Sequence, residues 1–127
     1  MKCLLDTHTA LWSLGNKAKL SENAVRVILD QANDVYVSIA SAWELAIKIS
    51  LGKLTFEGGM ERFFNMIGEC GFERLPVKEE HVKQLENLPY HHRDPFDRIL
   101  ITSAMAEGMC LITADTNMHR YDVACLW

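Results

Sequence analysis

The sequence predicts an α/β protein whose central, mostly parallel sheet is covered by helices on both faces. Short apolar or β-branched segments, typical of buried strands, occur at residues 3–5, 35–39 and 109–113. Segments with apolar residues three and four positions apart, typical of amphipathic helices, separate them. Strands that alternate with helices favour a parallel sheet between two helical layers. A length of 127 residues suits one domain spanning residues 1–127.

Several expected elements carry a local signal at their start or end. Ser21 is a good N-cap for a helix with apolar residues at positions 24, 25, 28 and 29. Ser41 and Glu44 have the spacing of a capping box, which predicts a helix that begins there and ends before Gly52. In chain order, the expected strands are residues 3–5, 35–39, 72–75, 109–113 and 123–126, and the expected helices are residues 9–14, 21–29, 41–49, 60–67, 82–85 and 95–107.

The last of these helices has a charged entrance, in the stretch HHRDPFDRILITSA. Asp94 is a good N-cap, and Pro95 suits the first helical position because it lacks an N–H. Asp97 falls in the first turn, where the helix dipole favours an anion. These local roles could account for both acids. Arg93 and Arg98 could form local salt bridges, or they could hold phosphate groups bidentately.

Composition and charge exclude several classes of protein. The chain has 13 basic and 17 acidic residues and a net charge of −4, whereas a generic nucleic-acid binder is basic. No apolar run approaches about 20 residues, so no membrane span is expected. An acid at position 6 comes too early for a signal peptide. Four cysteines without CxxC spacing predict a reduced, cytoplasmic protein with no disulfide framework and no zinc site.

Four acids are expected near one edge of the sheet. Asp6 and Asp115 each follow a predicted strand, and Glu44 lies in the first turn of the helix after the second strand. Because the carboxyl ends of parallel strands share one edge, these three should meet there. Asp97 can join them only if its helix starts at the same edge, and the sequence alone leaves that geometry open.

A cation would explain such a cluster. Each acid alone could cap a helix or turn, but carboxylates a few ångströms apart repel one another unless a cation joins them. Mg²⁺ and Mn²⁺ prefer oxygen ligands and retain water that a phosphate can replace. Without these four acids the chain has 13 acidic and 13 basic residues, so its net negative charge equals that of the predicted site.

The segments LLDTHTALW, SIASAWELAIK, HHRDPFDRILITSA and LITADTNMHRY resemble those of the PIN-domain ribonucleases. More narrowly, they resemble the VapC-type toxins of bacterial type II toxin–antitoxin pairs. The resemblance covers nearly the whole chain and implies a three-layer α/β/α sandwich that cleaves RNA with Mg²⁺ or Mn²⁺. It maps the family's catalytic, metal-binding acids onto Asp6, Glu44, Asp97 and Asp115. The resemblance therefore implies that Asp97 converges with the other three acids.

The resemblance also implies supporting residues and partners. Thr7 and Asn117 occupy positions that often support the site, and Asp94 is less certainly a ligand. Arg93 and Arg98 are candidates for binding the RNA substrate. An antitoxin is expected to insert a disordered, arginine-bearing segment among the carboxylates. An apolar stretch of that antitoxin could dock on the face carrying residues 63 and 64, and two copies of the chain are expected to form a homodimer.

Other functions fit the predicted fold less well. A phospho-receiver signalling module would need adjacent acids after the first strand and a lysine after the last, but Thr7 and His8 follow Asp6 and residues 123–127 contain no lysine. A haloacid-dehalogenase phosphatase would need Asp-x-Asp at that first position. A non-catalytic binding domain would not need the full set of acids.

Three other residues could suggest a ligand. His91 and His92 could bind a transition metal, but no third ligand has suitable spacing, so solvent-facing histidines are expected. Trp43 could stack on a nucleobase. Its place on a helix that looks buried favours packing in the core instead.

Overall fold

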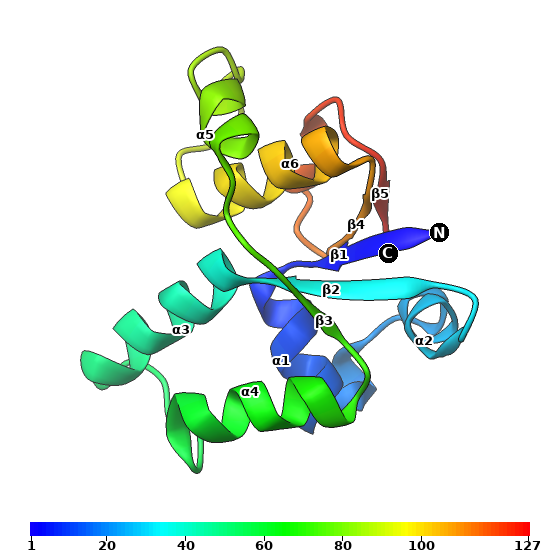
Figure 1. Cartoon of the computed structure of the whole chain (residues 1–127), viewed down its shortest axis with the longest axis vertical. Coiled ribbons are helices and arrows are strands. Elements are labelled where there is room, and N and C mark those ends of the chain that lie inside the picture. Colours follow the sequence, from blue (N-terminus) through cyan, green and yellow to red (C-terminus); the bar gives the residue numbers. More distant parts are fainter.

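A five-stranded, all-parallel sheet forms the centre of the molecule (Figure 1). The computed structural model describes residues 1–127. The strand order is β3-β2-β1-β4-β5, so β1 is central and strand order reverses beside it. The strands are β1 (Lys2–Leu5), β2 (Asp34–Ser38), β3 (Glu73–Leu75), β4 (Cys110–Ile112) and β5 (Cys125–Leu126).

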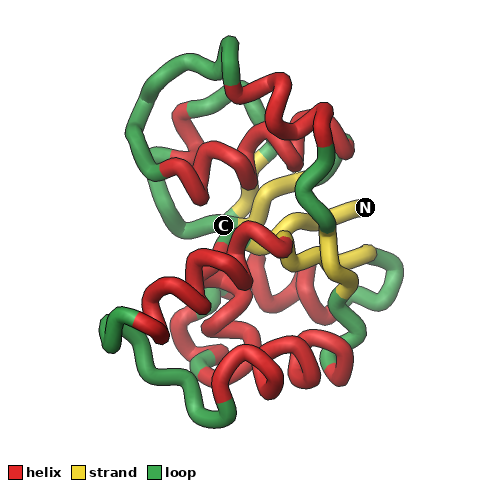
Figure 2. The backbone as a smooth tube through the Cα atoms, turned by 60° about the vertical axis from the view of Figure 1, so that its left-hand side comes forward, coloured by secondary structure: helices red, strands yellow, loops and turns green.

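Helices cover both faces of the sheet, which confirms the predicted three-layer α/β/α architecture (Figures 1 and 2). One layer contains α1 (Thr7–Gly15), α2 (Glu22–Leu29), α3 (Ile39–Ser50) and α4 (Gly59–Glu69). The other contains α5 (Glu79–Leu85) and α6 (Pro95–Glu107), which pack on each other. Two short 3-10 turns, Lys17–Lys19 and Met118–Arg120, complete the structure.

Two apolar cores lie on the two faces of the sheet, because side chains of a strand alternate between its faces. Cys3 and Leu5 of β1 enter the core beneath α1 to α4, together with Phe63 of α4. Leu4 enters the core beneath α6, together with Leu100. All five side chains are at most 1% exposed, so the central strand is buried on both sides.

The junction between β2 and α3 differs from the prediction. Ile39 is the first residue of α3 rather than the last of the strand, because Ser38 is the N-cap and its hydroxyl accepts from the N–H of Ala40 at 3.0 Å. The predicted capping box of Ser41 and Glu44 is therefore wrong. Glu44 lies in the second turn of the helix, which leaves its carboxylate free for contacts outside α3.

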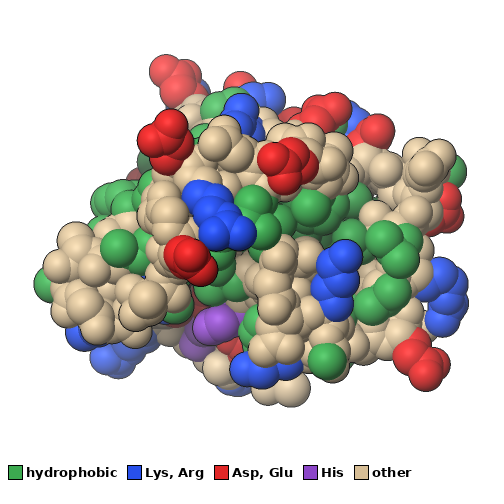
Figure 3. Space-filling model, turned by 90° about the horizontal axis from the view of Figure 1, so that it is seen from below, with side chains coloured by type: hydrophobic (Ala, Val, Ile, Leu, Met, Phe, Trp, Pro, Cys, Tyr) green, Lys and Arg blue, Asp and Glu red, His purple; other side chains and the backbone are tan.

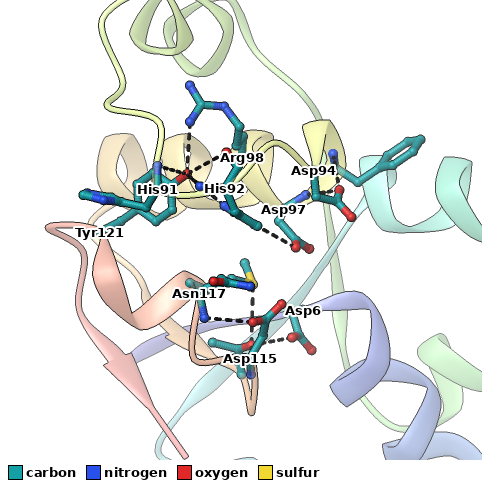
Figure 4. A network of polar contacts seen from close by, with 12 residues as sticks. Asp6, His91, His92, Asp94, Asp97, Arg98, Asp115, Asn117 and Tyr121 are labelled. Atoms are coloured by element: carbon teal, nitrogen blue, oxygen red, sulfur yellow. Dashed lines mark hydrogen bonds and ion pairs between the residues drawn. The ribbon is translucent and has the colours of Figure 1, made fainter.

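The start of α6 lies at the carboxyl edge of the sheet. The helix ends at Gly108, whose left-handed backbone (φ +65°) turns the chain directly into β4. A helix joined to its strand in this way runs antiparallel to it, so its first turn lies over the carboxyl end of β4. The geometry that the sequence left open for Asp97 is thereby decided, and the residue faces the loop after β4 (Figure 4).

The surface has no single basic face on the side seen in Figure 3, where acidic and basic side chains are interspersed with apolar ones. This agrees with the net charge of −4. None of the helices is both long enough and apolar enough to cross a membrane. The four cysteines are free thiols, and burial raises the pKa of Cys3 to about 11.

Candidate active site

Asp6 stands where β1 ends and α1 begins. Its Oδ1 accepts from the N–H of Thr9 at 2.8 Å, which makes it the N-cap of α1. Its Oδ2 accepts from the hydroxyl of Thr113. The residue is 5% exposed. Two donors therefore hold a nearly buried carboxylate in one orientation at the central strand of the sheet.

Thr113 connects Asp6 to Asp115. Its hydroxyl donates to Asp6 and accepts from the N–H of Asp115 at 3.0 Å. The carboxylate of Asp115 accepts from the N–H of Asn117 at 2.9 Å, so Asn117 supports the loop through its backbone rather than its amide side chain. The loop after β4 thus holds Asp115 beside Asp6 (Figure 4).

Glu44 reaches the same edge from the second turn of α3. The hydroxyl of Thr7 donates to its Oε1 at 2.8 Å and lies 3.1 Å from the hydroxyl of Ser41. The ammonium of Lys48, one turn later, lies 2.9 Å from Oε2. Glu44 is 6% exposed. Thr7, predicted as a supporting residue, therefore joins the start of α1 to the acid of α3.

Asp97 points toward Asp6 and Asp115 from the first turn of α6 (Figure 4). Its side chain is 17% exposed. Burial raises the pKa of Asp97 to about 6, and the charges of Asp94 and Asp115 act in the same direction. A hydrogen bond from His92 lowers the pKa and offsets part of this. The carboxylate is thus held among other acids.

Asp94 caps α6. Its Oδ1 accepts from the N–H groups of Phe96 and Asp97 at 2.9 and 3.1 Å, and Pro95 occupies the first helical position, as predicted. Asp94 is exposed. Its contacts are those of a helix cap, so it is distinct in role from Asp97 three residues later.

Arg98 is buried, and the prediction that it binds substrate is wrong. It is 4% exposed, and its guanidinium donates to the carbonyls of Leu88 and Pro89 and to the hydroxyl of Tyr121. These contacts leave it no access to a phosphate. Arg93 is exposed and its guanidinium has no hydrogen bond or ion pair, so it is free to bind one.

His92 contacts an acid of the site, which the sequence pattern does not predict. It is not solvent-facing: its side chain is 12% exposed, and its Nε2 lies 3.0 Å from Oδ2 of Asp97. Its Nδ1 lies 2.9 Å from the hydroxyl of Tyr121. The spacing of five residues between His92 and Asp97 is a weak signal. The other partner of His92 is Tyr121, which lies 29 residues away, so no local sequence pattern predicts this contact.

Two aromatic predictions are also corrected. Trp43 is 62% exposed and packs edge-on against Phe96, with ring centroids 5.2 Å apart, instead of entering the core. Phe63 is 1% exposed and packs between Phe56 and Phe64, so this face of α4 is not a free docking surface. The aromatic surface beside the site therefore belongs to α3 and α6.

The donor set suits a hard cation. Carboxylates from four elements converge on one edge. Burial raises the pKa of Asp97, and the charges of Asp94 and Asp115 add to this effect, as expected where carboxylates lie close together. As the side chains stand, no group of three or more carboxylate, imidazole or thiol side chains in the chain lies close enough together to hold a metal ion. Oxygen ligands that leave positions for water are those that Mg²⁺ and Mn²⁺ accept.

Replacement of Asp97 by asparagine is expected to stabilise the metal-free protein at neutral pH. The folded-state pKa of about 6 lies above the ordinary value of 3.8, so ionising Asp97 costs folding free energy. D97N should raise the free energy of unfolding by about 3 kcal/mol above pH 6, since one pKa unit is worth about 1.4 kcal/mol. The gain should shrink as the pH falls and vanish near pH 4. Urea unfolding in EDTA at both pH values measures it; a gain that persists at pH 4 would contradict this cause.

Known proteins share this fold and this sequence pattern. A family model described as the PIN domain matches residues 3–124. A chain of the VapBC2 complex from Rickettsia felis, bound to promoter DNA, is 14% identical, with a TM-score of 0.74 over 99% of this chain and 98% of that one. A chain of DNA-bound VapBC from Salmonella typhimurium is 16% identical, with a TM-score of 0.71 over 99% and 97%.

A chain of FitAcB from Neisseria gonorrhoeae is 20% identical, with a TM-score of 0.64 over 98% of this chain and 96% of that one. No curated protein matches the chain in sequence. At such identities the structural likeness is one of fold, whereas the family model matches the sequence itself over nearly its full length. The chain belongs to the PIN domain family, as its motifs predict.

Proposed function

We propose that this PIN-domain protein is a metal-dependent endoribonuclease and the toxin of a toxin–antitoxin pair. The observation that carries the proposal is the convergence of Asp6, Asp97 and Asp115 on the carboxyl edge of the sheet (Figure 4). Glu44 is joined to this edge by the hydroxyl of Thr7, the residue after Asp6. This is the place where α/β sheets bind ligands, next to the point where strand order reverses. The fold similarity to chains of VapBC complexes supports the toxin assignment.

Asp6 and Asp97 would hold Mg²⁺ or Mn²⁺, and Glu44 and Asp115 would complete the shell directly or through water. The bound cation would supply Lewis acidity, which activates water and stabilises charge on the phosphate. The protein's part is to hold oxygen ligands in place. Asp6 is oriented by two donors, and Asp97 by His92. Arg93, exposed before α6, is placed to bind a flanking phosphate.

The RNA-cleaving activity is tested directly with the purified chain. We expect cleavage of end-labelled, single-stranded RNA in the presence of Mg²⁺ or Mn²⁺, the ions that accept oxygen ligands and keep positions for water. We expect no cleavage in excess EDTA and recovery when metal is restored. Incubation with acetyl phosphate tests the phospho-receiver alternative. Phosphorylated protein and intact RNA would overturn the proposal, and intact RNA without phosphorylation would favour a binding domain.

An antitoxin would neutralise the site by occupying its carboxylates. We propose that it inserts an arginine, since Lys48 on Glu44 at 2.9 Å already shows a basic side chain bound to one of these acids. An apolar cavity of about 290 Å³ lies between α3, α5 and α6, lined in part by Trp43, Phe96 and Val82. Trp43 and Phe96 are the sequence neighbours of Glu44 and Asp97. Apolar residues of the same segment would dock there. The proposal also includes a homodimer. It further includes a cytoplasmic location, which the four free thiols support.

Inhibition by the protein encoded beside this gene is expected to compete with the metal. Titration of Mn²⁺ into the complex should show an apparent Mn²⁺ dissociation constant that is at least about tenfold higher than that of the free chain. Inhibition should also weaken with added salt, because the contact is between charges. Replacement of the inserted arginine by glutamine should restore metal binding, while replacement of an arginine elsewhere in the partner should not. Unchanged metal affinity in the complex would contradict this mode of inhibition.

A further inference from the structure

A chain of hydrogen bonds leads from the buried guanidinium of Arg98 to the carboxylate of Asp97. We propose that Arg98, Tyr121 and His92 form a directed relay of positioning residues, which sets the orientation of Asp97 for its cation. The inference rests on the proposed function and assigns to the second arginine of the HHRDPFDR stretch a role other than contact with RNA.

Three short contacts make up the relay, and Figure 4 shows them one after another from Arg98 to Asp97. Nη1 of Arg98 donates to the hydroxyl of Tyr121 at 3.0 Å. That hydroxyl lies 2.9 Å from Nδ1 of His92, and Nε2 of His92 lies 3.0 Å from Oδ2 of Asp97. No residue outside the relay contacts either ring nitrogen of His92.

The chemistry of these groups allows one direction of donation when Asp97 is ionised. A guanidinium can only donate, so it occupies a lone pair of the Tyr121 oxygen. A carboxylate can only accept, so Nε2 of His92 must carry the proton. In the neutral imidazole, Nδ1 is then an acceptor. The single proton of Tyr121 can go to Nδ1 at 2.9 Å or to the backbone carbonyl of His92 at 3.3 Å, and the contact with Nδ1 is the shorter. The tautomer of His92 is thus set by the carboxylate of Asp97, and Tyr121 matches it by offering its proton to Nδ1.

The far end of the relay is anchored in the fold. Arg98 is 4% exposed, and its two other hydrogen bonds go to backbone carbonyls, those of Leu88 at 3.0 Å and Pro89 at 2.7 Å. Its guanidinium also lies 3.7 Å from the ring centroid of Tyr90. Tyr121 is also 4% exposed and accepts from the backbone N–H of His92 at 3.3 Å. The relay therefore joins the loop before α6, the helix itself and the segment after β4 into one rigid support.

The near end of the relay leaves Asp97 ready for a cation. His92 occupies Oδ2, and Oδ1 has no hydrogen bond. The contact of His92 with Oδ2 restrains the rotation of the carboxylate and leaves Oδ1 open to a cation. Hydrogen bonds to metal-binding side chains commonly change metal affinity by about 10- to 100-fold.

Mn²⁺ titration of the purified full chain, by calorimetry, tests the relay without an activity assay. His92→Ala is expected to weaken Mn²⁺ binding about tenfold or more. His92→Gln keeps a donor close to the position of Nε2 and should restore most of the affinity. Tyr121→Phe removes only the hydroxyl and should weaken binding about threefold, a fraction of the effect of losing His92. His91→Ala is the matched control, because the ring of His91 packs on Tyr121 but makes no hydrogen bond to Asp97.

The combination of Tyr121→Phe with His92→Gln makes the test specific to the relay. Glutamine carries its donor whether or not Tyr121 has a hydroxyl, so Tyr121→Phe should have no further effect in the His92→Gln background. Equal losses from Tyr121→Phe in both backgrounds would overturn the relay, even if His92→Ala fails to fold. If Asp97→Ala abolishes Mn²⁺ binding and His92→Ala does not weaken it, only this inference fails. If Asp97→Ala binds Mn²⁺ normally, the proposed metal site fails as well.

Discussion

Replacement of Asp6 by asparagine is expected to reduce metal-dependent RNA cleavage by about 100-fold or more, since a lost metal ligand removes several kcal/mol of charge stabilisation. The fold should survive, because asparagine is as good an N-cap as aspartate and its oxygen can still accept from the N–H of Thr9. Its amide NH₂ would take the place of Oδ2 and can donate to the hydroxyl of Thr113. The loss would therefore come from the missing charge rather than from a disordered α1.

Cleavage rates measured over a range of Mn²⁺ concentrations, together with thermal melts, separate these causes. The matched control is Asp122→Asn, which makes the same chemical change at an exposed acid beside Met1, at the opposite edge of the sheet. It should retain full activity. A folded Asp6→Asn protein that cleaves RNA at the original rate would show that Asp6 holds no metal.

The two acids at the entrance of α6 are expected to give opposite results. Asp94→Ala removes the acceptor for the N–H groups of Phe96 and Asp97, so it should cost about 1 kcal/mol of unfolding free energy. It should cost little activity. Asp97→Ala should cost about 100-fold or more in cleavage, because it removes a carboxylate of the cluster. It should not destabilise the metal-free protein, since ionised Asp97 is held against burial and neighbouring charge.

Paired urea unfolding and cleavage assays on the two alanine variants decide between these roles. Asp94→Asn serves as the control for the cap, because asparagine caps helices as well as aspartate does and should restore stability. The reverse pattern, with activity lost at Asp94 and stability lost at Asp97, would assign the metal to Asp94.

The similar local sequence around these two acids explains why their roles are hard to tell apart without a structure. Both lie within three residues of the start of one helix, and either could interact with its N–H groups or its dipole. The cap contacts go to Asp94. Asp97 is turned instead toward Asp6 and Asp115, which come from two other elements (Figure 4).

The sequence by itself determined the class of fold and the set of acids. Alternating strand and helix patterns are local, since each depends on residues within a few positions of one another. The position of Asp6 directly after an apolar strand is equally local, and parallel strands then place it at the ligand-binding edge. For the same reason Asp94 and Pro95 correctly predict where α6 begins.

Only the tertiary structure decided the contacts between distant segments. Arg98 is charged, yet it is buried because carbonyls nine and ten residues earlier and a hydroxyl 23 residues later satisfy its donors. Trp43 is apolar, yet it is exposed, because it lies on the outer side of α3, where its ring packs edge-on against Phe96 instead of entering the core. His92 depends on Tyr121, 29 residues away. Burial and hydrogen bonding at these positions are properties of the packed chain, and no pattern in the adjacent residues encodes them.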